Sequence, residues 1–154
     1  MQQNKLRVFK FSELAALSSS LKDRHFEDVA IFLNADEDGI KFAGSHDMMK
    51  VFDKCMISIK EVRGSIDLDI RDNYLDDKKL AGIIKFIEFN PLVQKLNLNF
   101  PSNFITDKGF KAMISAIGEN CKELRSLGIN VDWYSNNNLG ILISKTAVSS
   151  IYQK

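Results

Sequence analysis

The sequence of 154 residues has little of what builds disulfide frameworks, metal clusters or membrane spans. It holds two cysteines and two prolines, and no apolar run approaches the roughly 20 residues of a membrane-spanning helix. Cys55 and Cys121 stand alone, which predicts neither a disulfide framework nor a metal cluster. We therefore expect an intracellular protein in a reducing compartment. The cytoplasm is the first choice and an organelle is the alternative.

A strong net charge and a catalytic motif are also lacking. Lysine and arginine number 21 against 20 acidic residues, so the net charge is +1. Such a balance gives no bulk attraction for nucleic acid or an acidic membrane. There is no glycine-rich phosphate loop and no nucleophile elbow, and the histidines His25 and His46 are isolated. We expect no enzyme, no cofactor, no bound metal, no small-molecule substrate and no nucleic-acid partner.

What the sequence does contain is one pattern written twice between Ile66 and Ile117. In each copy, alternating apolar residues precede an asparagine, and an apolar stripe with helical spacing follows. Asn103 in the second copy comes 30 residues after Asn73 in the first, and the other matched positions keep the same offset. A constant period of this size is typical of proteins built from stacked repeats.

Each copy of the pattern predicts a strand followed by a helix. Alternating apolar residues indicate a strand with one buried face, and spacings of three and four residues indicate an amphipathic helix. The strand positions are Ile66, Leu68 and Ile70, then Leu96, Leu98 and Phe100. The helix positions are Leu80, Ile83, Ile84 and Ile87, then Phe110, Met113, Ile114 and Ile117. Asp77 and Asp107 stand just ahead of these stripes, where a carboxylate can cap a helix.

These residues resemble a known repeat family. The pattern LxxLxLxxNxL followed by a helix resembles the leucine-rich repeat. Val93-x-x-Leu96-x-Leu98 with Asn103 through Gly109 resembles the ribonuclease-inhibitor-like subtype, and the run that includes Cys121-x-x-Leu124 is similar to the cysteine-containing subtype of F-box adaptors.

The resemblance implies an α/β fold: a right-handed leucine-rich-repeat solenoid forming a short horseshoe arc. Parallel strands would line the concave face and helices the convex face. It also implies that Asn73 and Asn103 turn inward and hydrogen-bond the backbone of the bend.

The chain divides by this pattern into a single domain of stacked units. Residues 1–25 are expected to be an N-terminal cap or a degenerate repeat. The leucine-rich-repeat domain would span residues 26–154 in about four units. Their ranges are 26–62, 63–92, 93–123 and 124–154, of which the last is a C-terminal cap.

The strand residues that the core does not use are the candidate binding residues. With one set of alternate side chains buried, the other set must point onto the concave face, which is rich in amides and acids. The candidates are Phe32, Asp67, Asp69, Arg71, Lys95, Asn97, Asn99, Asn130 and Asp132. Such a face suits a polar or basic protein segment, although ordinary solvent-facing sheet residues would look the same.

Trp133 and Tyr134 are possible edge contacts, since aromatic residues are enriched among interface hot spots. If the strand alternation continues past Val131, however, Trp133 points into the core.

The functional prediction is a non-catalytic protein–protein interaction module. It would be an accessory or structural subunit of a larger, hetero-oligomeric protein assembly. One alternative is a substrate-recognition adaptor of a ubiquitin ligase, suggested by the cysteine-type repeat. The other is a regulator of an enzyme, of the GTPase-activator type, because some ribonuclease-inhibitor-like repeat proteins act in that way.

Overall fold

A parallel sheet runs through the whole described part of the chain. The fold is known from a computed structural model, which describes residues 4–34 and 41–131. The strands lie in chain order and every neighbouring pair is parallel. They are β1 (Lys5–Val8), β2 (Asp28–Phe32), β3 (Ser65–Asp69), β4 (Lys95–Phe100) and β5 (Ser126–Val131).

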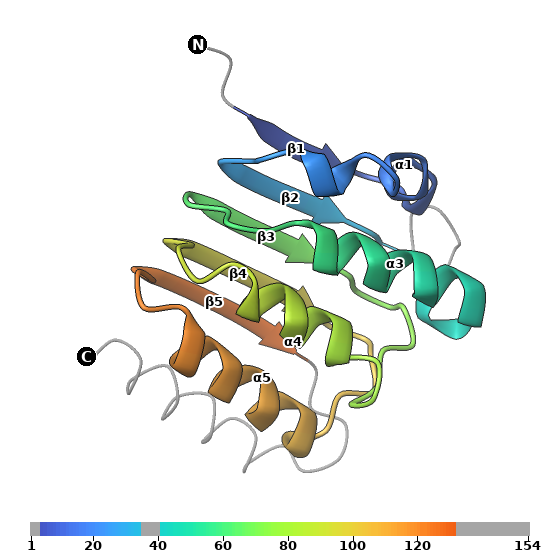
Figure 1. The fold of residues 1–154 in the computed structure, drawn as a ribbon. Helices are drawn as coiled ribbons and strands as arrows, with labels where there is room; N and C mark the ends of the chain where they lie inside the picture. Colours follow the sequence, from blue (N-terminus) through green and yellow to red (C-terminus); the bar gives the residue numbers. More distant parts are fainter. Residues whose placement is uncertain (1–3, 35–40, 132–154) are drawn as a thin grey trace.

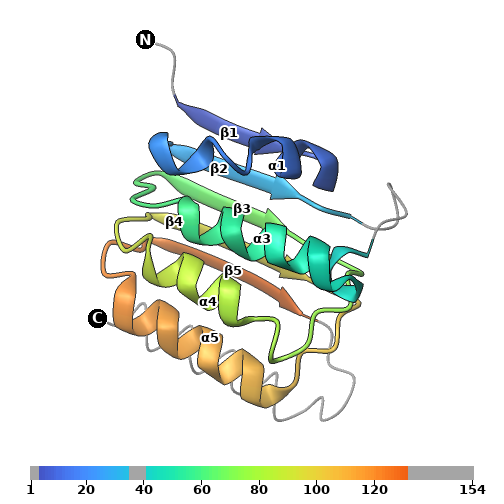
Figure 2. The ribbon, with the colours of Figure 1, turned by 45° about the vertical axis from the view of Figure 1, so that its right-hand side comes forward.

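The helices cover one face of this sheet (Figures 1 and 2). They are α1 (Phe11–Leu17), α3 (His46–Ser58), α4 (Ala81–Glu88) and α5 (Asp107–Asn120). Two 3₁₀ turns, η1 (Leu21–Asp23) and η2 (Phe42–Gly44), lie in the connections. The predicted α/β class, with parallel strands on one side and helices on the other, is confirmed. None of the described helices combines the length and the apolar character needed to cross a bilayer.

The repeat spacing determines how β3 and β4 pair. Ile66 lies opposite Leu96 and Asp67 opposite Asn97, so the offset of 30 residues becomes the register of the two strands. Ile66 and Leu96 are each only 2% exposed, and they face the helices. The predicted alternation is therefore confirmed, because only this register buries both apolar sets on one face.

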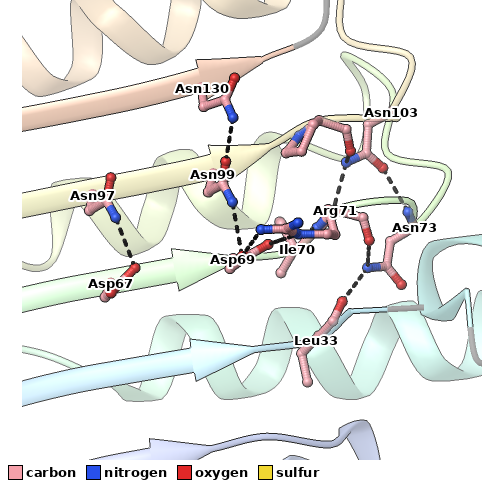
Figure 3. Close-up of polar contacts among 11 residues, drawn as sticks. Leu33, Asp67, Asp69, Ile70, Arg71, Asn73, Asn97, Asn99, Asn103 and Asn130 are labelled. Atoms are coloured by element: carbon pink, nitrogen blue, oxygen red, sulfur yellow. Dashed lines mark hydrogen bonds and ion pairs between the residues drawn. The ribbon is translucent and has the colours of Figure 1, made fainter. Parts of the chain in front are cut away.

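Buried asparagines join consecutive units at the bends after β3 and β4. Asn103 is 2% exposed, and its Oδ1 accepts the backbone N–H of Asn73 at 3.0 Å and of Leu75 at 2.9 Å. Its Nδ2 donates to the carbonyls of Ile70 at 3.0 Å and Phe100 at 3.2 Å (Figure 3). Asn73 itself is fully buried and bonded in the same manner one unit earlier. The structural role predicted for both residues is confirmed.

A third buried asparagine, Asn90, hydrogen-bonds backbone groups of two units at the opposite end of the helices. Asn90 is fully buried; its Oδ1 accepts from the Val62 N–H at 3.0 Å. Its Nδ2 donates to the carbonyls of Ile59 at 2.9 Å and Phe86 at 2.7 Å. Asn90 thus links the segment after α3 to the end of α4, so both ends of the helix layer are fixed by buried amides.

One predicted cap is wrong. Helix α4 begins only at Ala81, and Asp77 instead accepts hydrogen bonds from the backbone N–H of Thr106, at 2.8 Å, and from its hydroxyl. Asp77 therefore supports the entry to α5 in the next unit, because a stacked repeat brings that backbone closer than its own helix. Asp107 lies in the first turn of α5, where its charge meets the positive end of the helix dipole.

The first described residues join the sheet. Leu6 in β1 lies opposite Val29 in β2, and both are buried. The division of the chain into a cap and four units, and the arc shape, stay predictions. Cys55 and Cys121 are both buried as free thiols.

Candidate functional site

The sheet face opposite the helices, here called the open face, carries the candidate binding residues. Alternate residues of each strand point away from the core, so the strand register sets which of them are neighbours. Asp67 lies opposite Asn97, Asp69 lies opposite Asn99, and Asn99 lies opposite Asn130. The open face therefore aligns carboxylates on β3 with amides on β4 and β5.

Hydrogen bonds connect these side chains across the strands (Figure 3). Asn130 Nδ2 donates to Asn99 Oδ1 at 2.8 Å, and Asn99 Nδ2 donates to Asp69 Oδ2 at 2.9 Å. In the neighbouring row, Asn97 Nδ2 donates to Asp67 Oδ1 at 3.1 Å. We call this set the polar ladder; its members are Asp67, Asp69, Arg71, Asn97, Asn99 and Asn130.

The carboxylates fix the direction of every amide in the ladder. An ionised aspartate only accepts hydrogen bonds, so Asn97 and Asn99 must both turn their Nδ2 toward β3. The Oδ1 of Asn99 then points toward β5 and accepts from Asn130. The chemistry of Asp67 and Asp69 thus orders side chains on two further strands.

Arg71 closes the ladder at β3. Its Nη2 lies 2.7 Å from Asp69 Oδ2 and its Nε lies 3.0 Å from Asp69 Oδ1, which is a bidentate ion pair. Burial acts to raise the pKa of Asp69, but the hydrogen bonds from Arg71 and Asn99 and the charge of Arg71 outweigh it. The pKa of Asp69 therefore lies below its ordinary value. Asp69 is ionised, and the charge of Arg71 balances its own. Asp67 is then the acid of the ladder that has no ion pair among the described residues.

A glycine makes room for one rung. A Cβ atom on Gly128 would lie 2.7 Å from Oδ1 of Asn97. Gly128 lies directly opposite Asn97 in β5, so the absence of a side chain there lets the Asn97 amide lie across the strand toward its neighbour. The exposed Asn97 side chain can therefore keep its hydrogen bond to Asp67 while its Oδ1 occupies the space above Gly128.

An aromatic pair borders the ladder. Phe32 lies opposite Asp69 in the register, and its ring stacks on that of Phe9 with centroids 5.7 Å apart. Phe9 is 54% exposed and follows β1. Sequence reasoning found Phe32 but missed Phe9. The alternation of Leu6 and Val8 was the signal that could have placed Phe9 on the same face.

The remaining predicted residues separate into two groups. Lys95 is exposed at the start of β4, opposite Ser65 and Ser126, and lies one row away from Asp67 and Asn97. Asp132, Trp133 and Tyr134 lie outside the described residues. The structure thus brings together six of the predicted positions in the ladder and places Phe32 beside it.

Residues that commonly bind metals do not gather on the open face or elsewhere in the described ranges. Within residues 4–34 and 41–131, no group of three or more histidine, cysteine or acidic side chains is arranged to hold an ion. Burial raises the pKa of the Cys55 and Cys121 thiols to about 11, so both free thiols carry their proton at neutral pH.

The fold is similar to that of known proteins although the sequence is not. No protein-family model and no curated protein sequence matches the chain. The C-terminal domain of a Caenorhabditis elegans tropomodulin superimposes with a TM-score of 0.55 at 12% identity, covering 93% of both chains. A leiomodin-1 fragment described as actin-binding site 2 superimposes with a TM-score of 0.47 at 16% identity, covering 93% of this chain and 87% of that one. At these identities, the tropomodulin domain supports the fold alone.

The predicted subtype is wrong. The structural similarity is to a tropomodulin C-terminal domain, and it does not support a ribonuclease-inhibitor-like or cysteine-containing F-box-adaptor repeat. The motif did not distinguish subtypes, because its apolar and asparagine positions are set by the packing of a strand and a bend. Many stacked strand–helix units share that packing. The ubiquitin-ligase adaptor rested on that subtype and loses its basis.

Proposed function

We propose that this chain is a non-catalytic protein-binding module whose open face binds a polypeptide segment of another protein. The observation that carries the proposal is the polar ladder, a row of exposed or half-buried polar side chains held in one geometry by their own hydrogen bonds. A partner meeting such a face finds groups that are already ordered, so little conformational entropy is lost on binding.

The chemistry of the ladder defines the partner. Each amide keeps one N–H beyond its ladder bond, and Asp67 keeps one carboxylate oxygen without a partner among the described residues. A polypeptide backbone offers both donors and acceptors, and a basic side chain would complement Asp67. The Phe9–Phe32 stack next to the ladder offers an apolar contact. We therefore propose a segment with one basic and one apolar side chain, as part of a hetero-oligomeric intracellular assembly.

A quantitative purification tests this proposal. Tagged wild-type chain and an Asp67→Lys, Asn130→Lys variant are purified from cells, and the co-purifying proteins are identified. Each enriched protein is then titrated as a purified component against both chains. We expect the affinity of a true partner to fall at least about tenfold in the variant, because both an acceptor and the end of the ladder are replaced by cations.

The control variant carries lysines on the helix face. Glu119 and Ala112 are both exposed on α5, away from the open face, and Glu119→Lys with Ala112→Lys makes the same change in charge as the open-face variant. Partners that lose affinity equally for both variants would contradict the open-face proposal. A partner that binds both variants as well as it binds the wild type would do the same.

A further inference from the structure

A second surface lies away from the open face, between the approach to β2 and the end of α3. Its depression has a volume of about 400 Å³. Lys22, Arg24 and His25 line one side, and Ile57 from the last turn of α3 lies on the other. Lys60 and Glu61, which follow α3, complete the wall.

Positive charge dominates this depression. Lys22, Arg24 and Lys60 face the same space as a single acid, Glu61. All three cations are exposed, and none forms an ion pair with a described acidic residue. Three unpaired cations around one concave surface create a local positive potential, although the chain as a whole is almost neutral.

Aromatic rings hold two of these cations. The Arg24 guanidinium lies 4.9 Å from the centroid of Phe26, and Lys60 Nζ lies 4.6 Å from that of Phe89. Cation–π contacts restrain a side chain without cancelling its charge. Arg24 and Lys60 are thereby positioned for an anionic ligand that the described chain does not itself supply.

We propose that this depression binds an acidic peptide segment of a partner protein, with carboxylates on the cations and an apolar side chain against Ile57. Ile57 is 43% exposed on the wall, so it offers a large apolar side chain to a ligand beside the cations. The carbonyl end of α3 also faces this region, and its partial negative charge disfavours a compact phosphate. Separate carboxylates on an extended chain can reach each cation and avoid that end.

A binding titration on the full chain tests the proposal. The probe is a fluorescein-labelled synthetic peptide of glutamates with a central leucine, followed by anisotropy at about 0.15 M salt, where distant charges are screened beyond roughly 8 Å. We expect saturable binding that falls at least about tenfold in Lys22→Glu, Lys60→Glu. The matched control is Lys50→Glu, Lys111→Glu, which makes the same charge change at exposed positions of α3 and α5. It should keep the wild-type affinity within about twofold.

Several outcomes would overturn this proposal. They are absence of saturable binding, equal loss in both double variants, or unchanged affinity when serine replaces the leucine of the peptide. Binding of phosphatidylserine vesicles or inorganic phosphate without binding of the peptide would overturn it in favour of those ligands. If circular dichroism shows that Lys22→Glu, Lys60→Glu does not fold, Lys22→Gln, Lys60→Gln serves the same comparison. Asp67→Lys should leave peptide binding unchanged, which separates this surface from the open face.

Discussion

Asn103 Oδ1 accepts the backbone N–H of Asn73 at 3.0 Å, so the asparagine of one unit is hydrogen-bonded to the equivalent asparagine of the unit before it. The same Oδ1 also accepts from Leu75 N–H, while Nδ2 donates to the carbonyls around the bend. One side chain thus satisfies backbone groups of two units that are buried from water.

Replacing this residue should destabilise the fold. Asn103→Ala leaves buried N–H and C=O groups without partners, each of which costs about 1–3 kcal/mol. We expect the free energy of unfolding in urea to fall by roughly 2–4 kcal/mol, since some groups will recover a water. Asn97→Ala removes the same side chain at an exposed position and should change stability by less than about 0.5 kcal/mol. Equal effects of the two substitutions would contradict the role assigned to Asn103.

The Arg71–Asp69 ion pair should affect both the stability of the fold in acid and the pKa of Asp69. The pKa of Asp69 is lowered in the folded state, so the pair contributes stability above the ordinary aspartate pKa of about 3.9 and loses it as the pH falls through the folded pKa. Arg71→Met removes the cation and two hydrogen bonds. We expect an NMR titration of the Asp69 carboxyl carbon to show a higher pKa in this variant, together with lower stability at neutral pH.

Arg63→Met is the control for that titration. Arg63 is exposed and makes no ion pair with a described residue, so its loss should leave the pKa of Asp69 where it is. An unchanged Asp69 titration in Arg71→Met would show that the ion pair does not form in solution.

Asp53 should be a destabilising residue at neutral pH. Its Oδ1 is buried without a hydrogen-bond partner among the described residues and packs against Gly82 of α4. Burial raises the pKa of Asp53, so the charged form costs stability once the pH rises above the ordinary aspartate pKa. Asp53→Asn should therefore be more stable than the wild type at pH 7.

Urea unfolding at several pH values checks the sign of this effect. The advantage of Asp53→Asn should shrink as the pH falls through the raised pKa of the folded Asp53 carboxyl, and it should be lost below the ordinary aspartate pKa of about 3.9. Asp47→Asn provides the comparison, because Asp47 is exposed in the first turn of the same helix and favours the helix dipole. A destabilised Asp53→Asn variant would mean that the carboxylate has a favourable partner.

The two thiols should resist labelling until the chain unfolds. Cys55 is fully buried and Cys121 is 5% exposed, and burial raises the pKa of both to about 11. The thiolate is the reactive species, so iodoacetamide at pH 8 should modify neither at an appreciable rate in the native state and both in urea. Ser12→Cys, at an exposed position, should be modified quickly under native conditions. Rapid native labelling of Cys55 would contradict the packing of α3 against α1.

The repeat allowed much of the fold to be predicted from the sequence. Because the offset between the two copies is constant, the same offset sets the strand register, and it places Asp67 beside Asn97 and Asp69 beside Asn99. Binary alternation decided which side chains are buried, since a slip by one residue would expose the whole apolar set.

Side-chain partners were harder to predict, because they depend on distances within turns and between stacked units that no periodic pattern contains. The pairing of Arg71 with Asp69 follows from a turn after β3, and Asp77 binds Thr106 of the next unit in preference to its own helix. Phe9 and Phe32 stack across strands that are joined by a long connection without a repeat. The sequence placed residues on faces, while side-chain partners depended on how the units stack.

The asparagine links have a consequence for how the protein opens. Unfolding the unit that contains Asn103 would strip hydrogen bonds from Asn73 and Leu75 in its neighbour, so the two units share the cost of opening. Amide hydrogen exchange around β3 and β4 should then follow one common, slow opening. Strand β1, with four residues, is the shortest of the described strands and pairs only with β2 among them, so its amides should exchange faster than those of β3 and β4. We therefore expect β3 and β4 to open together and β1 to open separately.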